Sequence, residues 1–387
     1  MKSSDNDIYI YAQWIIDGLG HVLQDQIIHI QDHFIQSIQK AAPDSHHPCH
    51  IYLSQCTVLP WLIDAHVHLC LSGSLDLSIR QNQLNQSHDD IQSKIWEHIQ
   101  QHISYGIGGV RDGGDQWANG LIVRHQLKTS PLSFFTYQTP GTAWFKKGRY
   151  GTFVGRPIHQ VQEIENAVTQ ESNQVDIIKI IQSGMNSLDT LGKETLPQFS
   201  LSEMNHIKAI ATRLQKQIMV HANGKKPVQI AIESGCHSIE HGFFMGEDNL
   251  YRMADKQIIW VPTICTMKAA SCFSIEYKHR EIAKQTFDHQ MEQLQKAKTL
   301  GVPVTIGTDS GCPGVHHGQA LIDEMALFLE AGYSISDIIQ SSTQLGASLI
   351  NLSYSGLFPG APARFIAVDG SPDNLPHSLN QIRYQIY

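Results

Sequence analysis

The sequence predicts an α/β fold: a (β/α)8 TIM-type barrel with a small β-sandwich domain built from both chain ends. Three observations predict this fold. Short apolar runs alternate with helical patterns through the middle of the chain, as in βα units around a parallel sheet. Several of these runs, such as 58–63 and 302–307, are bounded by polar or glycine residues, which is typical of strands buried on both faces. Both ends instead have the pattern of short strands and turns, at 7–58 and 356–369.

The barrel elements are predicted from these patterns in chain order. The capping-box pattern from Ser200 to Glu203 predicts the start of one helix, and Gly235 predicts the end of the next. Eight strands favour a closed barrel over an open sheet. The predicted strands are 58–63, 105–110, 132–137, 175–180, 217–220, 236–240, 258–262 and 302–307, and the predicted helices are 91–104, 161–168, 202–214 and 225–234.

The division into domains follows from the change in pattern. We expect 1–58 plus 355–387 to form the small β domain and 59–354 to form the barrel. The longest irregular stretch, 139–156, is rich in glycine and aromatic residues. A loop of that length inside a compact domain is more often functional than not, so we expect a lid or a substrate wall there. A turn-rich break is expected at 41–48.

Composition excludes several classes of partner. The formal net charge of −8 argues against nucleic acid, because a phosphate-binding surface needs a basic excess. No apolar stretch approaches the roughly 18–20 residues of a membrane span, and 1–7 lacks the apolar core of a signal peptide. The 7 cysteines are an odd number without a CxxC pair, which indicates free thiols in a reducing compartment. We therefore expect a cytoplasmic protein without nucleic acid or membrane partners, and the sequence leaves a homo-oligomer open.

Polar residues follow the predicted strands at their carboxyl ends. His66 and His68 are two apart on a strand, so both imidazoles project to one face. His221, His241 and Asp309 each end an apolar run. Taken singly, each histidine is more often a satisfied core residue, and the aspartate is nearly as often a turn cap. Because active sites of β/α barrels lie at this face, the coincidence of all five predicts a metal centre.

Lys179 is the unusual member of this set, because it interrupts the apolar run 175–181. Burying its ammonium is costly unless the group has a partner. One interpretation is that the amine pairs with a nearby acid such as Asp309. The other is that desolvation among cations lowers the pKa of Lys179 and frees a nucleophilic amine.

These segments, in order, resemble the ligand set of the amidohydrolase superfamily. The matching motifs are Asp-x-His-x-His at 64–68, Lys179, His221, Glu-His-Gly at 240–242 and Gly-Thr-Asp at 307–309. Among the branches of this superfamily, the chain looks most similar to the one that holds imidazolonepropionase-like and prolidase-like enzymes. Further matches at 110–112, 183–184, 317–318 and 356–360 extend the resemblance over nearly the whole chain.

The resemblance implies a binuclear centre. Lys179, carboxylated by CO2, would bridge two divalent metal ions, for which zinc suits the ligands best and manganese or cobalt also fit. Asp309 would belong to the more buried ion and would be the catalytic base, taking the proton of a metal-bridging hydroxide and passing it to the leaving nitrogen. The implied metal ligands are His66, His68 and Asp309 for the more buried ion, His221 and His241 for the more exposed ion, and Lys179 for both.

The function that this implies is hydrolysis of an amide-type carbon–nitrogen bond in a small molecule: a dipeptide, an N-acyl amino acid or a cyclic amide. One alternative is a mononuclear aminohydrolase, or deaminase. It is disfavoured because no acid follows His221 within 222–226 and because Lys179 would have no role. The other alternative, a non-catalytic metal-binding barrel, is disfavoured by the complete ligand set.

The chain departs from the branch where substrate is bound. The glycine-histidine segment that is common after the third strand is absent, and 141–153 has a different sequence. Arg149, Tyr150 and His317 are the candidates for substrate contacts, against the alternative that each packs a loop or lies at the surface. Arg111 is expected to have a structural pairing role. The final return to the β domain has Ala-Arg-Phe at 363–365 where the branch has Ala-Asp-Leu.

Overall fold

The computed structural model describes residues 7–42, 49–83, 85–170, 174–353 and 355–387. Most of the predicted turn-rich break at 41–48 and nearly all of 1–7 lie outside these residues. The strands are β1 (Ile8–Ile16), β2 (Val22–Gln31), β3 (Phe34–Lys40), β4 (Ile51–Pro60), β5 (Leu62–Val67), β6 (Ile107–Asp112), β7 (Thr136–Gln138), β8 (Ala143–Lys146), β9 (Gly155–Ile158), β10 (Ile177–Ile181), β11 (Gln217–Ala222), β12 (Ser238–His241), β13 (Ile259–Val261), β14 (Phe365–Asp369) and β15 (Ile382–Ile386). The α-helices are α1 (Leu77–Gln83), α2 (His88–Ser104), α3 (Asn119–Leu127), α4 (Val161–Gln170), α5 (Leu201–Arg213), α6 (Lys225–Glu233), α7 (Glu247–Lys256), α8 (Cys265–Phe273), α9 (Tyr277–Leu300), α10 (Gln319–Glu330), α11 (Ile335–Gln340) and α12 (Gly346–Leu349), with a π-helical turn at Ser341–Leu345 between the last two.

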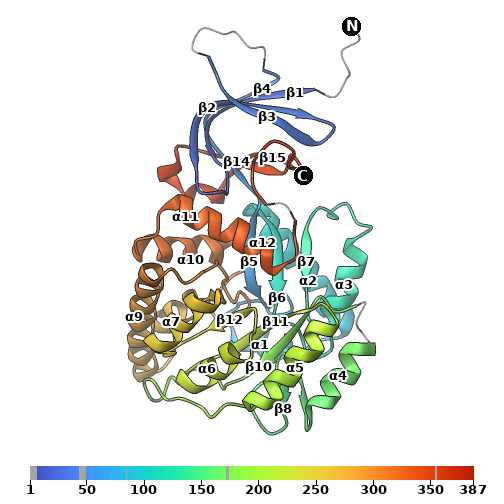
Figure 1. Cartoon of the computed structure of the whole chain (residues 1–387), viewed down its shortest axis with the longest axis vertical. Helices are drawn as coiled ribbons and strands as arrows, with labels where there is room; N and C mark the ends of the chain where they lie inside the picture. Colours follow the sequence, from blue (N-terminus) through green and yellow to red (C-terminus); the bar gives the residue numbers. More distant parts are fainter. Residues whose placement is uncertain (1–6, 43–48, 84, 171–173, 354) are drawn as a thin grey trace.

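Strands from both chain ends pair in one six-stranded sheet, in the order β15-β14-β4-β1-β2-β3. Figure 1 shows it at the end of the molecule that carries the N-terminus. Both ends contribute, as expected, but as one sheet rather than as the two facing sheets of a sandwich. The reason lies in β4, which pairs with β1 on one edge and with β14 on the other, so the late strands extend the same ladder. Its own strands supply most of a buried cluster, including Ile10, Ile28 and Phe365.

The middle of the chain forms two parallel sheets with helices packed around them (Figure 1). One sheet has the order β5-β6-β7 and the other β13-β12-β11-β10-β8-β9, and every strand pair in both is parallel. Their strands are largely buried, and side chains such as Val110, Val220 and Ile239 belong to one large core cluster. This arrangement confirms an α/β fold. The Ser200 capping box of α5 is present, and α6 ends just before Gly235, as predicted.

The predicted eighth strand, 302–307, does not form a regular ladder, and Val304 makes a single isolated parallel bridge with Trp260. Pro303 has no N–H to donate to a ladder, and the segment changes neighbour along its length. It bonds first to β13 and then to β5, so it bridges the two parallel sheets and delivers Asp309 beside His66. The backbone hydrogen bonds join Pro303 and Thr305 to Trp260, Ile306 to Ala65, and Asp309 to His66.

The stretch 139–156 is less irregular than predicted, because β8 forms within it, β9 begins at its end, and the two strands pair in parallel. The physical reason is burial of its aromatic residues: Trp144 is 5% exposed and Phe145 is 2% exposed, so the segment gains by joining the sheet. The parts of the stretch outside the two strands are 139–142 and 147–154. The role of this stretch as a lid or a substrate wall stays a prediction.

All seven cysteines are free thiols, as the odd count without CxxC pairs indicates. Across the described part of the chain, no helix combines the length and the apolar character needed to cross a bilayer.

The carboxylate of Glu324 holds the start of α8 in the core. It lies on α10 and accepts hydrogen bonds from the backbone N–H groups of Ile264 at 2.9 Å and Cys265 at 2.8 Å. Glu324 is fully buried, and this burial raises the pKa of its carboxyl group from 4.5 to about 7. The folded state therefore binds the proton of Glu324 more tightly than the unfolded state does. The stabilisation of the fold by this tighter proton binding is complete below pH 4.5 and is lost as the pH rises through about 7.

We expect Glu324→Gln to flatten this pH dependence. As the pH rises from 4.5 to above 7, the wild type should lose about 3 kcal/mol of unfolding free energy relative to the variant. Urea unfolding at several pH values measures this difference. Glu330→Gln, on the exposed side of the same helix, is the control and should track the wild type at every pH. Parallel pH profiles for Glu324→Gln and the wild type would contradict the assignment.

Candidate metal centre

Six polar side chains from five separate segments meet in the interior. They come from the end of β5, from β10, β11 and β12, and from the segment that bridges the two sheets. All of them are buried, although charged and imidazole groups normally face water. Their exposed fractions are 0% for His66, 8% for His68, 2% for Lys179, 9% for His221, 6% for His241 and 7% for Asp309.

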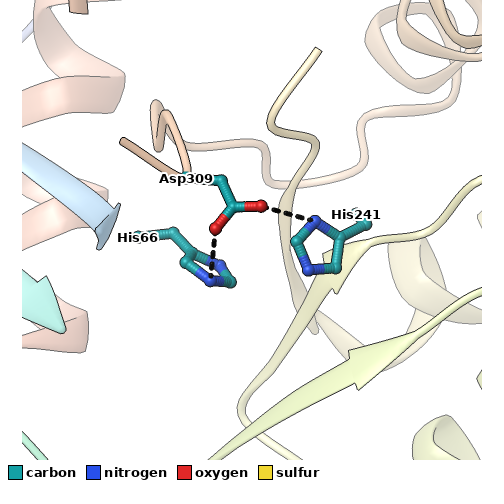
Figure 2. Close-up of side chains that lie close together, drawn as sticks. All are labelled: His66, His241 and Asp309. Atoms are coloured by element: carbon teal, nitrogen blue, oxygen red, sulfur yellow. Dashed lines mark ion pairs between the residues drawn. The ribbon is translucent and has the colours of Figure 1, made fainter. Parts of the chain in front are cut away.

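Asp309 lies at the centre of this group. One carboxylate oxygen, Oδ1, is 3.6 Å from Nε2 of His66 and 3.4 Å from Nε2 of His68. Figure 2 shows the same carboxylate reaching His66 on one side and His241 on the other. The ring of His221 is 4.6 Å from that of His241, centroid to centroid. His66, His241 and Asp309 each offer a ligand atom within 4.8 Å of the others, so this group could hold a metal ion.

Each of the four imidazoles has one ring nitrogen hydrogen-bonded to the surrounding protein. A carboxylate or carbonyl oxygen can only accept, so the ring nitrogen that faces one must carry the proton. The other nitrogen is then free for a ligand bond, which is the usual arrangement of metal-binding histidines. The pairs are His66 Nδ1 with Glu240 Oε2 at 2.8 Å, His68 Nδ1 with the Gly114 carbonyl at 3.4 Å, His221 Nε2 with the Gly184 carbonyl at 3.2 Å and His241 Nδ1 with the Thr263 hydroxyl at 2.7 Å.

Three atoms of the group have no hydrogen-bond partner: His66 Nε2, Lys179 Nζ and Asp309 Oδ1. Buried polar atoms are normally satisfied, and an unpaired buried charge is costly. Three such atoms in one buried group of residues therefore mark a place for a further polar group. Imidazole and carboxylate ligands suit a divalent cation, so the residues present fit one. No hydrogen bond joins the amine of Lys179 to Asp309, so the structure does not support the interpretation that these two groups pair.

Burial also sets the protonation of the group. It lowers the pKa of His68 to about 4 and that of His221 to about 3, and it places the pKa of His66 and His241 well below the ordinary value. The imidazoles are thus neutral near pH 7, which is the form that binds metal. Burial is also the largest influence on Lys179, whose pKa it lowers to about 8. A neutral amine, the form that reacts with CO2, is therefore accessible near neutral pH.

The backbone is strained at two of these residues. Asp309 has φ of 58° and His241 has φ of 67°, both in the left-handed region that non-glycine residues rarely adopt. Strain of this kind persists where the surrounding structure enforces it, and it clusters at functional sites. Asp64 is part of that enforcement, because its carboxylate accepts hydrogen bonds from the backbone and the hydroxyl of Thr308 at 3.0 and 2.7 Å.

The sequence interpretation assigned no role to Glu240, Thr263 or Cys312. Glu240 contacts His66, Thr263 contacts His241, and the thiol of Cys312 donates to Oδ2 of Asp309 at 3.2 Å. Of these three residues, only Glu240 could have been noticed in the sequence, because it is an acidic residue within a strand that is expected to be buried. Arg111 does have the expected pairing role, and its partner is Glu240 at 2.8 Å.

The three substrate-contact candidates lie in different environments. Tyr150 is beside the cluster, with its ring 5.6 Å from that of His221 between centroids. Arg149 is exposed and donates to the Leu196 carbonyl, so it holds two loops together. His317 is 3% exposed and has both ring nitrogens engaged, with Ser310 at 2.9 Å and the Leu71 carbonyl at 2.7 Å. For Arg149 and His317 the geometry favours the packing alternative, whereas contact between Tyr150 and substrate stays a prediction.

The parallel strands bring buried imidazoles, a carboxylate and a lysine together. The chain is therefore an α/β protein with an internal cluster of side chains that could bind a metal ion. The family model described as "Amidohydrolase family" matches residues 57–385. The chain belongs to the amidohydrolase family, as the motifs at the strand ends predicted.

Solved structures and curated proteins agree with this assignment. A crystal structure of a Xaa-Pro dipeptidase with methionine bound in its active site superposes with a TM-score of 0.84, at 25% identity over 98% of each chain. The crystal structure of Aspergillus niger ochratoxinase has a TM-score of 0.81 at 19% identity, over 99% of this chain and 95% of the other, which shows a shared fold. In sequence, A. niger ochratoxinase is 27% identical over 161 residues, which are 40% of this chain and 32% of that enzyme. The match thus spans about a third of the curated relative's length.

Proposed function

We propose that the protein is a metal-dependent hydrolase that cleaves an amide-type carbon–nitrogen bond of a small molecule, such as a dipeptide, an N-acyl amino acid or a cyclic amide. The observation that carries the proposal is the buried group of unpartnered ligand atoms on His66, Lys179 and Asp309. Membership of the amidohydrolase family supports it. So does similarity to a Xaa-Pro dipeptidase over nearly the whole chain and to ochratoxinase over part of it.

The proposed cofactor is a pair of divalent ions, zinc before other metals, with Lys179 carboxylated by CO2 between them. Bound there, such ions would lower the pKa of a water molecule and polarise the substrate carbonyl. The unpartnered Nζ of Lys179 supports the carboxylation, because an unmodified buried amine would stay unsatisfied. The proposed ligands are His66, His68 and Asp309 for one ion, His221 and His241 for the other, and the modified Lys179 for both.

Asp309 is the proposed catalytic base. Its Oδ2 is held by the thiol of Cys312, while Oδ1 is unpartnered and faces the imidazoles. In this position the carboxylate would take a proton from the attacking water and pass it to the leaving nitrogen. Tyr150, next to His221, would form one wall for the substrate.

The wider architecture is proposed on the same basis. We propose that the two parallel sheets close into one (β/α)8 barrel over 59–354, with the chain ends as a separate β domain. The backbone bonds from the segment 303–309 to β13 and β5 support closure. The seven free thiols support a cytoplasmic location, and the net charge of −8 supports a small-molecule substrate rather than nucleic acid.

Metal removal and a substrate panel test the proposed function. Zinc-loaded protein should hydrolyse members of a panel of dipeptides, N-acyl amino acids and lactams. Treatment with a chelator should lower that rate by at least about 100-fold, since the ions supply the nucleophile, and zinc with bicarbonate should restore it. Turnover confined to esters or phosphoesters would overturn the amide assignment. Full activity of the stripped protein would overturn metal dependence.

A further inference from the structure

Glu240, on β12, is fully buried and surrounded by hydrogen-bond donors. Its Oε2 accepts from Nδ1 of His66 at 2.8 Å, and its Oε1 accepts from the guanidinium of Arg111 at 2.8 Å and from the hydroxyl of Ser238. Arg111 is itself held in place, because it also donates to the Ala65 carbonyl at 2.8 Å. The charge of Glu240 is thus balanced by Arg111, and both of its oxygens are used.

This contact determines which nitrogen of His66 faces the metal centre. A carboxylate oxygen only accepts, so Nδ1 of His66 carries the proton and Nε2 keeps its lone pair. Nε2 is the buried atom without a partner, and it lies 3.6 Å from Oδ1 of Asp309. Glu240 therefore holds His66 in the one tautomer that can bind a metal through Nε2.

The other three imidazoles are held differently. His68 and His221 face backbone carbonyls, and Nδ1 of His241 faces the Thr263 hydroxyl at 2.7 Å, with the Asp309 carboxylate farther away at 3.9 Å, so the hydrogen-bond partners of all three are neutral. A charged acceptor makes a stronger hydrogen bond than a neutral one and raises the basicity of the imidazole ligand further. Of the four imidazoles, only that of His66 therefore has a carboxylate as its hydrogen-bond partner in the surrounding protein.

We propose that Glu240 is a positioning residue that, through His66, selectively strengthens the ion on the His66 side of the centre relative to the ion of His221 and His241. This inference rests on the proposed function, because it requires the two ions. Arg111 serves it by pairing with the buried side chain of Glu240 at 2.8 Å.

Glu240→Gln is the sharpest variant, because it changes the hydrogen-bonding pattern and leaves the shape. The amide has one oxygen, and both the guanidinium of Arg111 and the hydroxyl of Ser238 need it as a hydrogen-bond acceptor. Its NH2 group must then face Nδ1 of His66, so Nδ1 becomes an acceptor and the proton moves to Nε2. A metal ion would have to displace that proton, and we expect the affinity for the ion on this side to fall about 10–100-fold.

The experiment measures zinc binding to the full chain by chelator competition, together with the histidine tautomers of the metal-free protein by ¹⁵N NMR. The signal of His66 is assigned from its absence in His66→Asn. We expect Glu240→Gln to weaken one ion about 10–100-fold, to leave the other within about threefold, and to move the His66 proton to Nε2. Ser238→Ala removes another partner of the same carboxylate without touching His66, so both ions should stay within about threefold of wild type. Thr263→Val removes the partner of His241 and should weaken the other ion instead.

Two results separate this inference from the proposed function. If the wild type binds two ions and Glu240→Gln binds both equally well, or keeps the His66 proton on Nδ1, the positioning role is wrong and the proposed function stands. If the wild type binds no divalent ion, the proposed function fails first and the positioning role fails with it. A general loss of structure is detected separately, because it would weaken both ions and lower the unfolding midpoint of the metal-free protein.

Discussion

Asp309→Asn is expected to lower kcat/KM by about 10²–10⁴-fold, the usual contribution of a general acid–base group, while metal binding at the proposed centre is kept. The amide cannot accept the proton of the attacking water, but its carbonyl oxygen can still bind a cation. The Oδ1 position, 3.4 Å from Nε2 of His68 and 3.6 Å from Nε2 of His66, is kept by a side chain of the same shape.

The backbone at residue 309 should keep its conformation in this variant. Asp309 has φ of 58°, and asparagine tolerates that left-handed conformation as well as aspartate does. The hydrogen bond from Asp309 N–H to the His66 carbonyl at 2.7 Å does not depend on the side chain. A loss of activity in Asp309→Asn therefore reports chemistry rather than misfolding.

Steady-state kinetics and elemental analysis on the same preparation check the result. Asp288→Asn, on the surface of α9 where Asp288 pairs with Lys284, is the matched control and should retain full activity. An Asp309→Asn enzyme with more than a tenth of wild-type kcat/KM and full metal content would exclude Asp309 as the base.

The buried cluster of polar residues was predictable because its signal is local. His66, His221 and His241 each end an apolar run, and parallel strands bring their carboxyl ends to one face of the sheet. The structure does bring these side chains together, along with Lys179 and Asp309. Their spacing in the sequence carries none of this information, whereas their position at strand ends carries nearly all of it.

What the sequence did not predict depends on contacts between distant segments. The bridging segment near Pro303 has strand-like composition but divides its bonds between two neighbours, which no local pattern encodes. Trp144 and Phe145 join a sheet because their side chains become buried there, although the glycines around them in the sequence suggest a loop. Glu240 gains its role only because Arg111 and His66, far away in the sequence, face it.

The second large effect is expected at Lys179. We expect Lys179→Ala and Lys179→Met each to lose at least one ion per chain. Activity should fall further than the roughly 10–100-fold that removal of an outer hydrogen-bond partner costs, because a direct bridge between the ions is lost. Elemental analysis measures the metal content. In wild-type protein, ¹³C NMR with labelled bicarbonate should show a carbamate signal that both variants lack.

The two variants separate the bridging role from packing. Lys179 is 2% exposed, so alanine leaves a cavity and should destabilise the protein by about 2–5 kcal/mol, as other large-to-alanine changes in cores do. Methionine fills nearly the same volume and removes an amine that has no hydrogen-bond partner, so the metal-free Lys179→Met protein should be at least as stable as the wild type. Loss of metal in both variants, with loss of stability in only one, is the pattern that a bridging lysine predicts. Two ions per chain in Lys179→Met would show that the centre assembles without the lysine, and the carboxylated bridge would then be wrong even if Asp309 proved essential.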